Sequence, residues 1–260
     1  MPFLINEIIS SDGYLNYCLD NNICYIKTDY FYNGQINWRG QSHPSKIDEF
    51  CVMGHSDHPV TDYIASNFKK VFCINKYCDI PNVFGIPLGI TNDCDDSSIH
   101  RIYGNKDIMI DVMNTDIPKD NLAYLNFDVS TYKQEREYVL NFFKNEKWVK
   151  IGKIENTLEG RRLFLSEIKS SKFVFCPRGN GIDTHRLWET LYMGSYPIVK
   201  YENTHDLFKD LPILFIKDWS EINEDFLNDK FIEFKNNNWN LEKLKLSYWL
   251  DFIKNEKNKK

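Results

Sequence analysis

Residues Lys172–Val199, with the sequence KFVFCPRGNGIDTHRLWETLYMGSYPIV, decide the fold of this chain. The apolar start predicts a strand, and Gly179 and Gly181 bracket a turn in which glycine permits torsions and close approaches that other residues forbid. Asp183 is the predicted N-cap of a helix that ends at Gly194, before a second strand. This order is typical of an α/β protein, and the turn offers free backbone N–H groups to an anion at the helix start.

Charged side chains surround this predicted anion site. Arg178 and Arg186 flank the turn, and each charge-assisted hydrogen bond from a guanidinium to a phosphate contributes roughly 1.5–3 kcal/mol. Glu189 follows Arg186 by three residues, which places both on one helix face, where the carboxylate is positioned to accept the two ribose hydroxyls of a nucleotide. The structural alternative is a tight turn in which Arg186 and Glu189 form an ordinary ion pair.

The same turn also suggests the dinucleotide-binding fingerprint of a nicotinamide- or flavin-dependent oxidoreductase. Gly179, Gly181 and Thr184 nearly match the G-x-G-x-x-G/A pattern after a strand, and Glu202 ends the next strand about 20 residues further on. Two features count against this alternative. Thr184 replaces the third small residue that close helix–strand packing needs, and only about 80 residues follow, too few for the usual pair of βαβαβ halves.

The rest of the chain alternates short apolar runs with amphipathic stretches, a pattern typical of parallel sheets covered by helices. Thr131 and Gln134 form a capping-box pattern that predicts a helix start, and further helices are expected over Arg161–Ser170 and from about Thr184 to Met193. Doubly wound sheets of this kind bind ligands at the carboxyl ends of their strands. Strands are predicted at Ile23–Lys27, Phe50–Met53, Lys70–Ile74, Asn82–Ile86, Asp107–Val112, Ala123–Phe127, Trp148–Ile151, Phe173–Cys176, Tyr196–Lys200 and Ile213–Phe215.

Composition and charge exclude several classes of protein. The chain has 260 residues, 42% of them hydrophobic and 27% charged, so it is neither a disordered segment nor a fibre. Its formal net charge of −5 argues against nucleic-acid binding. No apolar stretch approaches the roughly 18 residues that span a bilayer. No secretory signal is visible at the N-terminus and the 7 cysteines form no C-x-x-C pair, so a cytoplasmic location is expected.

The charge is distributed unevenly along the chain. Residues 1–105 contain 7 basic and 12 acidic side chains, whereas residues 106–260 contain 25 of each. The polar stretch TNDCDDSSIHRIYGN, at Thr91–Asn105, is a candidate interdomain linker. We therefore expect two domains, 1–105 and 106–260, with the anion site in the second.

The segment around the turn resembles the signature of exostosin-like glycosyltransferases of the family 47 type. That signature has the form C-P-R-G-x-G-x-D-[ST]-x-R-x-[WY]-E, followed by a glycine and a proline-containing strand. The many matched positions make the resemblance specific over about 30 residues, while Leu125–Glu137 and Asp210–Ile222 resemble flanking segments more loosely. The matched residues are Cys176, Pro177, Arg178, Gly179, Asn180, Gly181, Asp183, Thr184, Arg186, Trp188, Glu189, Gly194 and Pro197.

This resemblance implies a GT-B architecture, in which two Rossmann-like domains face each other across a cleft. The domain at 1–105 would hold the acceptor, and the domain at 106–260 would hold the nucleotide sugar. By analogy, Arg178 and Arg186 would bind the diphosphate and Glu189 the ribose. The loop Gly179–Thr184 would lie over the phosphates. The same donor pocket would include Asn180, Gly181, Asp183, Asn126, Thr131 and Arg136.

The resemblance also implies the type of reaction. Such enzymes typically transfer a sugar from a UDP-sugar to a glycan hydroxyl with inversion at the anomeric carbon. They need no metal or other cofactor, because arginines and a helix dipole take the place of a cation. UDP-xylose is the first candidate donor, since a small, cramped enzyme suits a pentose. Donors of glucuronic acid, N-acetylglucosamine, galactose and arabinose stay open.

An inverting transfer needs a base that accepts the proton of the attacking hydroxyl, a contribution of about 10²–10⁴-fold. In a GT-B enzyme this base comes from the first domain, at the end of a strand that faces the cleft. The segment Glu49–Pro59, EFCVMGHSDHP, offers Asp57 as the predicted base, with His55 and His58 as alternatives. These three side chains could instead hold a metal ion, or Asp57 could cap the helix that starts near Val60.

An aromatic and polar loop follows the first predicted strand. Tyr32, Trp38 and Arg39 are side chains of the kind that stack on sugar faces, and they are the predicted acceptor-binding residues. The alternative is ordinary surface packing. For the whole chain, a further alternative is a non-catalytic relic of the transferase fold, which would bind a nucleotide or carbohydrate without a working base.

Overall fold

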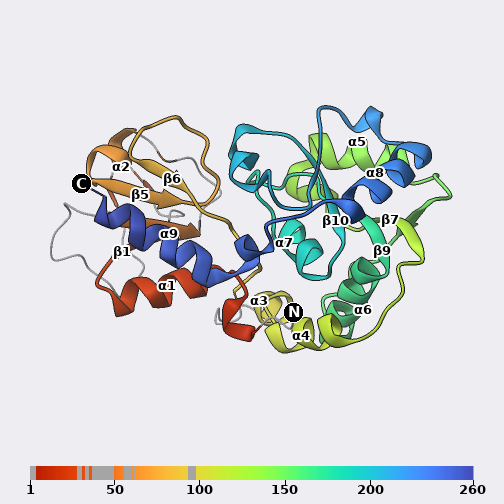
Figure 1. The fold of residues 1–260 in the computed structure, drawn as a ribbon, viewed down its shortest axis with the longest axis horizontal. Coiled ribbons are helices and arrows are strands. Elements are labelled where there is room, and N and C mark those ends of the chain that lie inside the picture. The colour runs from red at the N-terminus through yellow and green to blue at the C-terminus, as the bar shows by residue number, and fades with distance from the viewer. Residues whose placement is uncertain are drawn as a thin grey trace.

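A computed structural model describes residues 4–27, 31–32, 35–36, 50–55, 60, 62–92 and 98–259. Figure 1 shows two lobes, each built around its own sheet. Within this part of the chain, every neighbouring pair of strands in the two larger sheets is parallel. The predicted class, an α/β fold with parallel sheets flanked by helices, is therefore confirmed.

The first lobe contains a four-stranded sheet with the order β1-β4-β5-β6 in the described residues. Its side chains alternate between two apolar layers, as expected for strands that are covered on both faces. Helices α1 and α9 cover one face and the short helix α2 lies on the other. The bounds are β1 Cys24–Lys27, β4 Phe50–His55, β5 Lys70–Cys73, β6 Val83–Gly85, α1 Ser11–Asp20, α2 Asp62–Ser66 and α9 Leu246–Asn258; β2 Phe31–Tyr32 and β3 Gln35–Ile36 form a separate antiparallel pair.

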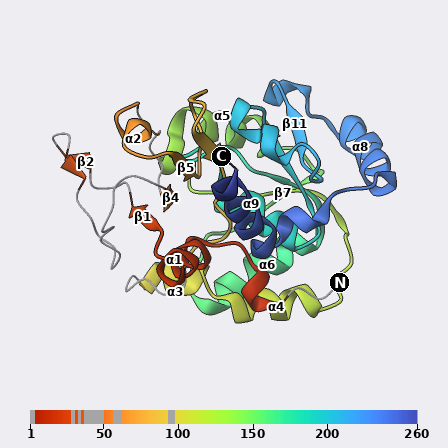
Figure 2. The same ribbon diagram turned by 60° about the vertical axis from the view of Figure 1, so that its left-hand side comes forward.

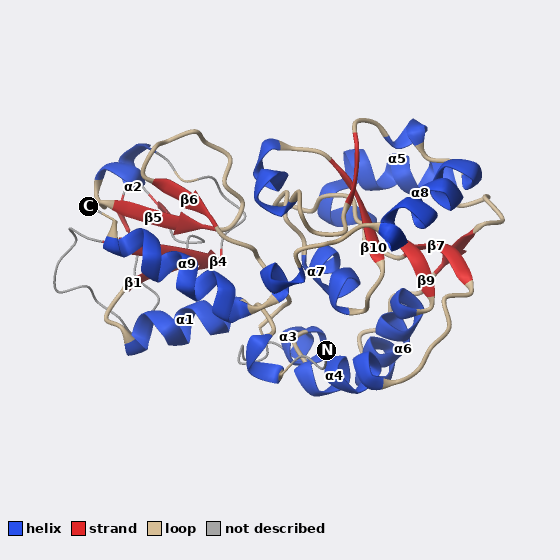
Figure 3. Ribbon diagram, viewed as in Figure 1, coloured by secondary structure: helices blue, strands red, loops and turns tan. Residues whose placement is uncertain are grey.

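The second lobe contains a five-stranded sheet with the order β11-β10-β9-β7-β8 in the part of the chain that is described. Helices α4, α6 and α7 pack on one face and α5 and α8 on the other (Figure 3). The bounds are α3 Ser98–Tyr103, α4 Lys106–Asn114, β7 Asn121–Leu125, α5 Lys133–Phe143, β8 Val149–Ile151, α6 Leu158–Lys169, β9 Ser171–Phe175, α7 His185–Tyr192, β10 Tyr196–Lys200, β11 Leu214–Ile216 and α8 Glu224–Asn236. Short 3-10 helices lie at η1 Ile5–Glu7, η3 Val129–Tyr132, η4 Asn203–Phe208, η5 Trp219–Glu221 and η6 Leu241–Leu244.

One hydrophobic core joins the two lobes. It contains buried side chains from both sheets and from α1, α4, α6, α7 and α9. A chain of aromatic contacts crosses it: Trp188 on α7 meets Phe208 at 5.1 Å between ring centroids, Phe208 meets Trp249 at 6.2 Å, and Phe252 meets Phe72 of β5 at 6.2 Å. Helix α9 thus follows the second sheet in sequence but packs beside α1 on the first (Figure 2).

The predicted strands correspond to observed strands with one exception. Residues 107–112 were expected to be a strand but form most of α4. The run of isoleucine, methionine and valine has strand-like composition, yet Met109 and Val112 are buried at helical spacing. The side chain of Asn105 accepts a hydrogen bond from the N–H of Ile108 and caps the helix. This prediction was wrong because a cap and a tertiary contact outweighed β propensity.

Two further details of the helices can be compared with the sequence predictions. The predicted capping box is absent at α5, because Thr131 belongs to the preceding turn η3, whose N-cap is Asp128. The predicted stop after α7 is confirmed, since Gly194 has a φ of +68°, a conformation that favours glycine. Among the described residues, no helix is long and apolar enough to cross a membrane.

Candidate functional site

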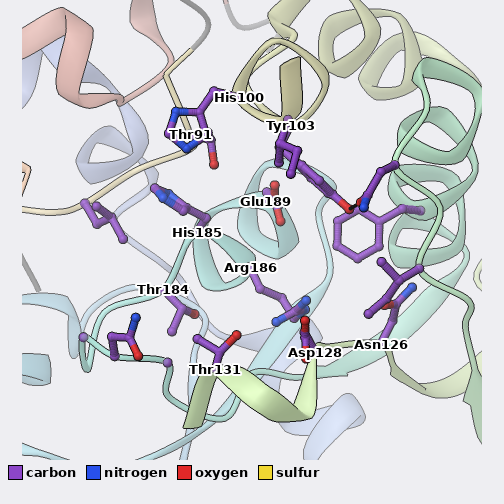
Figure 4. A pocket seen from close by; sticks show the side chains of 18 of the residues that line it. Thr91, His100, Tyr103, Asn126, Asp128, Thr131, Thr184, His185, Arg186 and Glu189 are labelled. Carbon is purple, nitrogen blue, oxygen red and sulfur yellow. Dashed lines mark hydrogen bonds between the residues drawn. The ribbon is translucent and has the colours of Figure 1, made fainter. Parts of the chain in front are cut away.

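A cavity of about 570 Å³ lies where the carboxyl ends of strands from both sheets converge. Its wall includes residues that follow β5, β6, β7, β8 and β9 in sequence, together with residues of α3, α6 and α7. Figure 4 shows Arg186 and Glu189 on α7, with Asn126 and Asp128 from the segment after β7 nearby. The cavity therefore occupies the place that an open parallel sheet offers to a ligand.

The structure brings most of the predicted donor residues to this cavity. Arg178 is the exception: its guanidinium lies 4.6 Å from the centre of the Tyr132 ring, and its Nη2 donates to the carbonyl of Asn180. Arg178 therefore contacts the glycine turn but does not line the cavity. The predicted residues that line the cavity are Asn126, Thr131, Arg136, Gly179, Asn180, Gly181, Asp183, Thr184, Arg186 and Glu189.

Asp183 links the glycine turn to the first lobe. Its backbone N–H donates to Oδ1 of Asn75 over 2.7 Å, and its Oδ2 accepts from the N–H of Leu88 over 2.8 Å. Its Oδ1 accepts from the indole N–H of Trp188 over 2.8 Å. Thr184 is the N-cap of α7, with a hydroxyl that accepts from a backbone N–H of the first turn. The predicted capping role of Asp183 was therefore wrong, because both of its oxygens serve other donors.

Burial raises the pKa of Asp183 to about 7, well above the usual value for an aspartate. The hydrogen bonds from Leu88 and Trp188 oppose this rise, because they favour the ionised carboxylate. A carboxyl group at the contact between the two lobes thus titrates near neutral pH.

The two glycines of the turn are needed for close approach. A Cβ atom at Gly181 would lie 2.5 Å from Nδ2 of Asn75, and one at Gly179 would lie 3.2 Å from Nη2 of Arg136. Asn75 itself is buried and has a φ of +52°, a left-handed conformation that asparagine tolerates better than most residues. The glycine turn therefore packs closely against Asn75, at the end of β5, and against Arg136 of the second lobe.

Arg136 and Arg186 place positive charge on the cavity wall. Arg136 donates from Nε to the carbonyl of Arg178 over 2.9 Å and from Nη1 to the carbonyl of Asp128 over 2.7 Å. Burial and, secondarily, the charge of Arg186 lower the pKa of Arg136 to about 10. Neither arginine forms an ion pair with a carboxylate of the described residues, and the buried Nε of Arg186 has no hydrogen-bond partner among them. Such a pair of cations favours an anionic ligand.

Glu189 pairs with Arg161, an arginine outside the predicted donor pocket. Its Oε1 lies 2.5 Å from Nη1 of Arg161 on α6, so the ion pair between Arg186 and Glu189 that was considered as the alternative does not form. Glu189 is only 4% exposed, but it lines the cavity. Nothing in the local sequence marks Arg161, because its partner lies on another helix.

Several other cavity residues were also missed. Helix α3 lies in the segment predicted to be a linker, and it contributes Tyr103, whose hydroxyl donates to Oδ1 of Asn156 over 2.7 Å. His185 lines the cavity with its Nδ1 at 2.8 Å from the carbonyl of Gly89. The remaining cavity residues that were not predicted are Ile74, Thr91, Ile99, His100, Asp128, Lys153, Ile154, Glu155, Asn156, Gly160 and Phe164.

The predicted base and acceptor residues mostly lie outside the described residues. This applies to Asp57, His58, Trp38 and Arg39, while only the backbones of His55, at the end of β4, and Tyr32, in β2, are described. Among the described side chains, no group of three or more His, Cys, Asp or Glu residues could hold a metal ion. These predictions stay predictions.

Glu202, the residue that the dinucleotide alternative would use to bind ribose, has a structural role. Its side chain accepts a backbone hydrogen bond at the start of η4, and the side chain of His205 in turn accepts from the N–H of Glu202. Glu202 is also not among the residues that line the cavity. The observed arrangement therefore gives no support to the dinucleotide fingerprint.

Comparison with known protein families places more than half of the chain in a described family. The family model described as the RXYLT1 C-terminal domain matches residues 124–260, which is more than half of the chain. No curated protein matches. The matched region begins in β7 and includes the glycine turn, Arg136, Arg161, Arg186 and Glu189.

Proposed function

The chain belongs to the RXYLT1 C-terminal domain family, a xylosyltransferase-related family of glycosyltransferases, and from this premise we propose that it transfers a sugar from a UDP-sugar to a hydroxyl of a glycan. UDP-xylose is the first donor to test, because the family name and the expectation from the chain's small size point the same way. Membership in the exostosin-like family 47 stays a prediction. So does the cytoplasmic location.

The positive cavity wall beside the glycine turn is the observation that carries this proposal. Arg136 and Arg186 are partly or fully buried and have no carboxylate partner among the described residues, while the N-terminus of α7 adds the positive end of a helix dipole. A nucleoside diphosphate supplies the missing negative charge. The volume of about 570 Å³ lies within the roughly 300–1,000 Å³ that is usual for small-molecule sites.

We assign the parts of the donor to the wall as follows. The diphosphate lies against Arg136, Arg186 and the turn Gly179–Thr184, and the ribose hydroxyls face Glu189. Asn126 and Thr131 complete this part of the pocket. Residues 1–105 form the acceptor side and residues 106–260 the donor side of a GT-B arrangement. Support comes from the two parallel sheets and from the position of the cavity at their carboxyl ends.

In the proposed reaction an acceptor hydroxyl attacks the anomeric carbon from the face opposite the diphosphate. The new C–O bond forms as the bond to UDP breaks, so the configuration is inverted. The base, Asp57 or alternatively His55 or His58, takes the hydroxyl proton, and the departing UDP carries the electron pair of the broken bond. Arg136, Arg186 and backbone N–H groups stabilise the charge that develops on the leaving diphosphate, without a metal.

Binding of UDP to matched arginine variants tests the proposal. Arg186→Met keeps an apolar stem against Phe127 and Phe164 but removes the charge, whereas Arg162→Met removes an exposed arginine that pairs with Asp111 outside the cavity. Loss of a charged hydrogen bond is expected to weaken UDP binding by about 1.5–3 kcal/mol in the first variant. Titration calorimetry that finds equal UDP affinity in both variants would contradict the assigned pocket.

Turnover separates catalysis from mere binding. A panel of UDP-sugars, with NAD and NADP as controls, identifies the donor by the stabilisation it confers in a thermal melt, and the preferred donor is then tested for UDP release with sugar acceptors. Asp57→Ala is expected to abolish transfer while nucleotide affinity stays within a few-fold of wild type. Stabilisation by NAD alone would contradict the proposal, and a protein that binds UDP without turnover would be the non-catalytic relic.

A further inference from the structure

The ion pair between Arg161 and Glu189 is almost completely removed from solvent. The side chain of Arg161 is 0% exposed and that of Glu189 is 5% exposed. The two residues differ in one respect: Glu189 lines the cavity, whereas Arg161 does not. Arg161 therefore contacts the carboxylate from the side that faces the protein interior.

Stability alone gives a poor account of this pair. A buried ion pair often stabilises a protein less than apolar side chains of similar volume would, since desolvation offsets the attraction. Moreover, Nε and Nη2 of Arg161 are buried without a hydrogen-bond partner among the described residues. The guanidinium lies instead 5.7 Å from the ring centres of Tyr103 and Phe164. Buried unsatisfied groups of this kind call for a functional explanation.

The geometry of the carboxylate supplies that explanation. Oε1 of Glu189 is occupied by Arg161, while Oε2 has no hydrogen-bond partner among the described residues. The residue itself belongs to the cavity wall (Figure 4). An ion pair with one oxygen fixes the rotamer of the side chain and leaves the second oxygen to accept from a ligand.

The ring of Phe164 lies close to both Arg161 and Arg186. Its ring centre lies 5.7 Å from the guanidinium of Arg161 and 5.8 Å from that of Arg186. The two arginines beside the ring differ in their partners: Arg161 is paired with a carboxylate, and Arg186 has no carboxylate partner among the described residues. This difference in partners suits different tasks, with Arg161 orienting Glu189 and Arg186 binding an anion.

We propose that Arg161 is a positioning residue, which holds Glu189 so that its second oxygen accepts hydrogen bonds from the ribose hydroxyls of the donor nucleotide. This inference rests on the proposed function, because it requires a nucleotide in the cavity. Arg161 does not touch the ligand. Its effect is on selectivity for the ribose, which a merely structural ion pair would not influence.

The test compares UDP with 2′,3′-dideoxy-UDP, which lacks both ribose hydroxyls, by titration calorimetry. Wild-type protein is expected to prefer UDP by roughly 10–150-fold, the equivalent of one hydrogen bond to a charged group. Arg161→Met should reduce this preference to less than about 3-fold by lowering the affinity for UDP, while the affinity for the dideoxy compound stays nearly constant. Arg161→Lys, which keeps the charge, should restore part of the preference.

Two further variants keep the result interpretable. Arg162→Met, the neighbouring exposed arginine on α6, is the control and should retain the full preference. If Arg161→Met does not fold, Glu189→Gln and Arg161→Lys provide the comparison, and both should show a smaller preference than wild type. A preference for UDP as large as that of wild type in the folded Arg161 variants would overturn the inference and leave the proposed function standing. Wild-type protein that does not bind UDP would overturn both.

Discussion

Replacement of Gly181 by alanine tests the close contact between the glycine turn and Asn75 of the first lobe. The new Cβ atom would lie 2.5 Å from Nδ2 of Asn75 and 3.0 Å from its Cγ and Oδ1. Ordinary contact begins near 3.4 Å, so the turn and Asn75 must separate by about 0.9 Å (3.4 minus 2.5). Asn75 is buried, and its Oδ1 accepts from the N–H of Asp183 over 2.7 Å, so little room is available.

The expected cost has two parts. Overpacking in a filled interior costs typically about 1–3 kcal/mol. A separation of this size also breaks the hydrogen bond from Asp183, and a buried donor without a partner costs about 1–3 kcal/mol. Because both effects arise at the same contact, we expect Gly181→Ala to lower the free energy of unfolding by about 2–4 kcal/mol and to weaken UDP binding.

A double-mutant cycle with Asn75→Ala identifies the contact. Urea unfolding is measured for wild type, both single variants and the double variant. Truncation of Asn75 removes the clashing atoms, so the double variant should be more stable than the sum of the single effects predicts, by about 0.5–3 kcal/mol. Gly179→Ala is the comparison: its Cβ would meet Nη2 of Arg136 at 3.2 Å and Cγ2 of Thr131 at 3.4 Å but no atom of Asn75, so it should cost less than Gly181→Ala and show no coupling to Asn75→Ala. Strict additivity between Gly181→Ala and Asn75→Ala would refute the proposed contact.

Three other predictions concern the cap of α7, the pH dependence of stability and the role of metals. Thr184→Ala should lower the free energy of unfolding by about 0.5–2 kcal/mol through loss of the N-cap, with Thr184→Ser close to wild type in urea unfolding. Burial lowers the pKa of His205 from 6.5 to about 4, so the unfolded state binds more protons between these values and stability is lost as pH falls through this window. The stability advantage of wild type over His205→Gln should therefore shrink by about 3 kcal/mol from pH 7 to pH 4, and a constant difference would contradict the shift. UDP affinity should be equal in EDTA and in magnesium, whereas a tenfold loss in EDTA would require a metal that the arginines do not replace.

The parts of the site that the sequence predicts are local in the chain. The glycines, Thr184, Arg186 and Glu189 lie within a single strand–turn–helix unit, so their spacing alone brings them together. The end of α7 is equally local, because Gly194 adopts the positive φ that its position after the helix requires. Residues that are close together in sequence thus supply much of the predicted donor pocket.

The missed parts depend on contacts between distant segments. Asn75 and Asp183 are 108 residues apart, and Arg161 and Glu189 are 28 apart on different helices. Neither Asn75 nor Arg161 stands in a recognisable motif. Tyr103 was hidden for another reason: it lies in a polar stretch that suggested a linker, but this stretch includes α3 and forms one side of the cavity. Packing against the second lobe decides its role, and no local pattern encodes that packing.

The contact between the lobes also restricts where a base can act. The residues after β5 and β6, Asn75 and Leu88, hold Asp183, so these strand ends meet the donor turn directly. Strand β4 runs parallel to β5 and pairs with it, with Met53 opposite Cys73, and neighbouring strands lie about 4.8 Å apart. The chain that leaves β4 at His55 therefore starts one strand spacing from the strand end that touches the turn. A base supplied by the segment after β4 would therefore start one strand spacing from the contact with the turn, whereas one placed after β1 would start a further strand away.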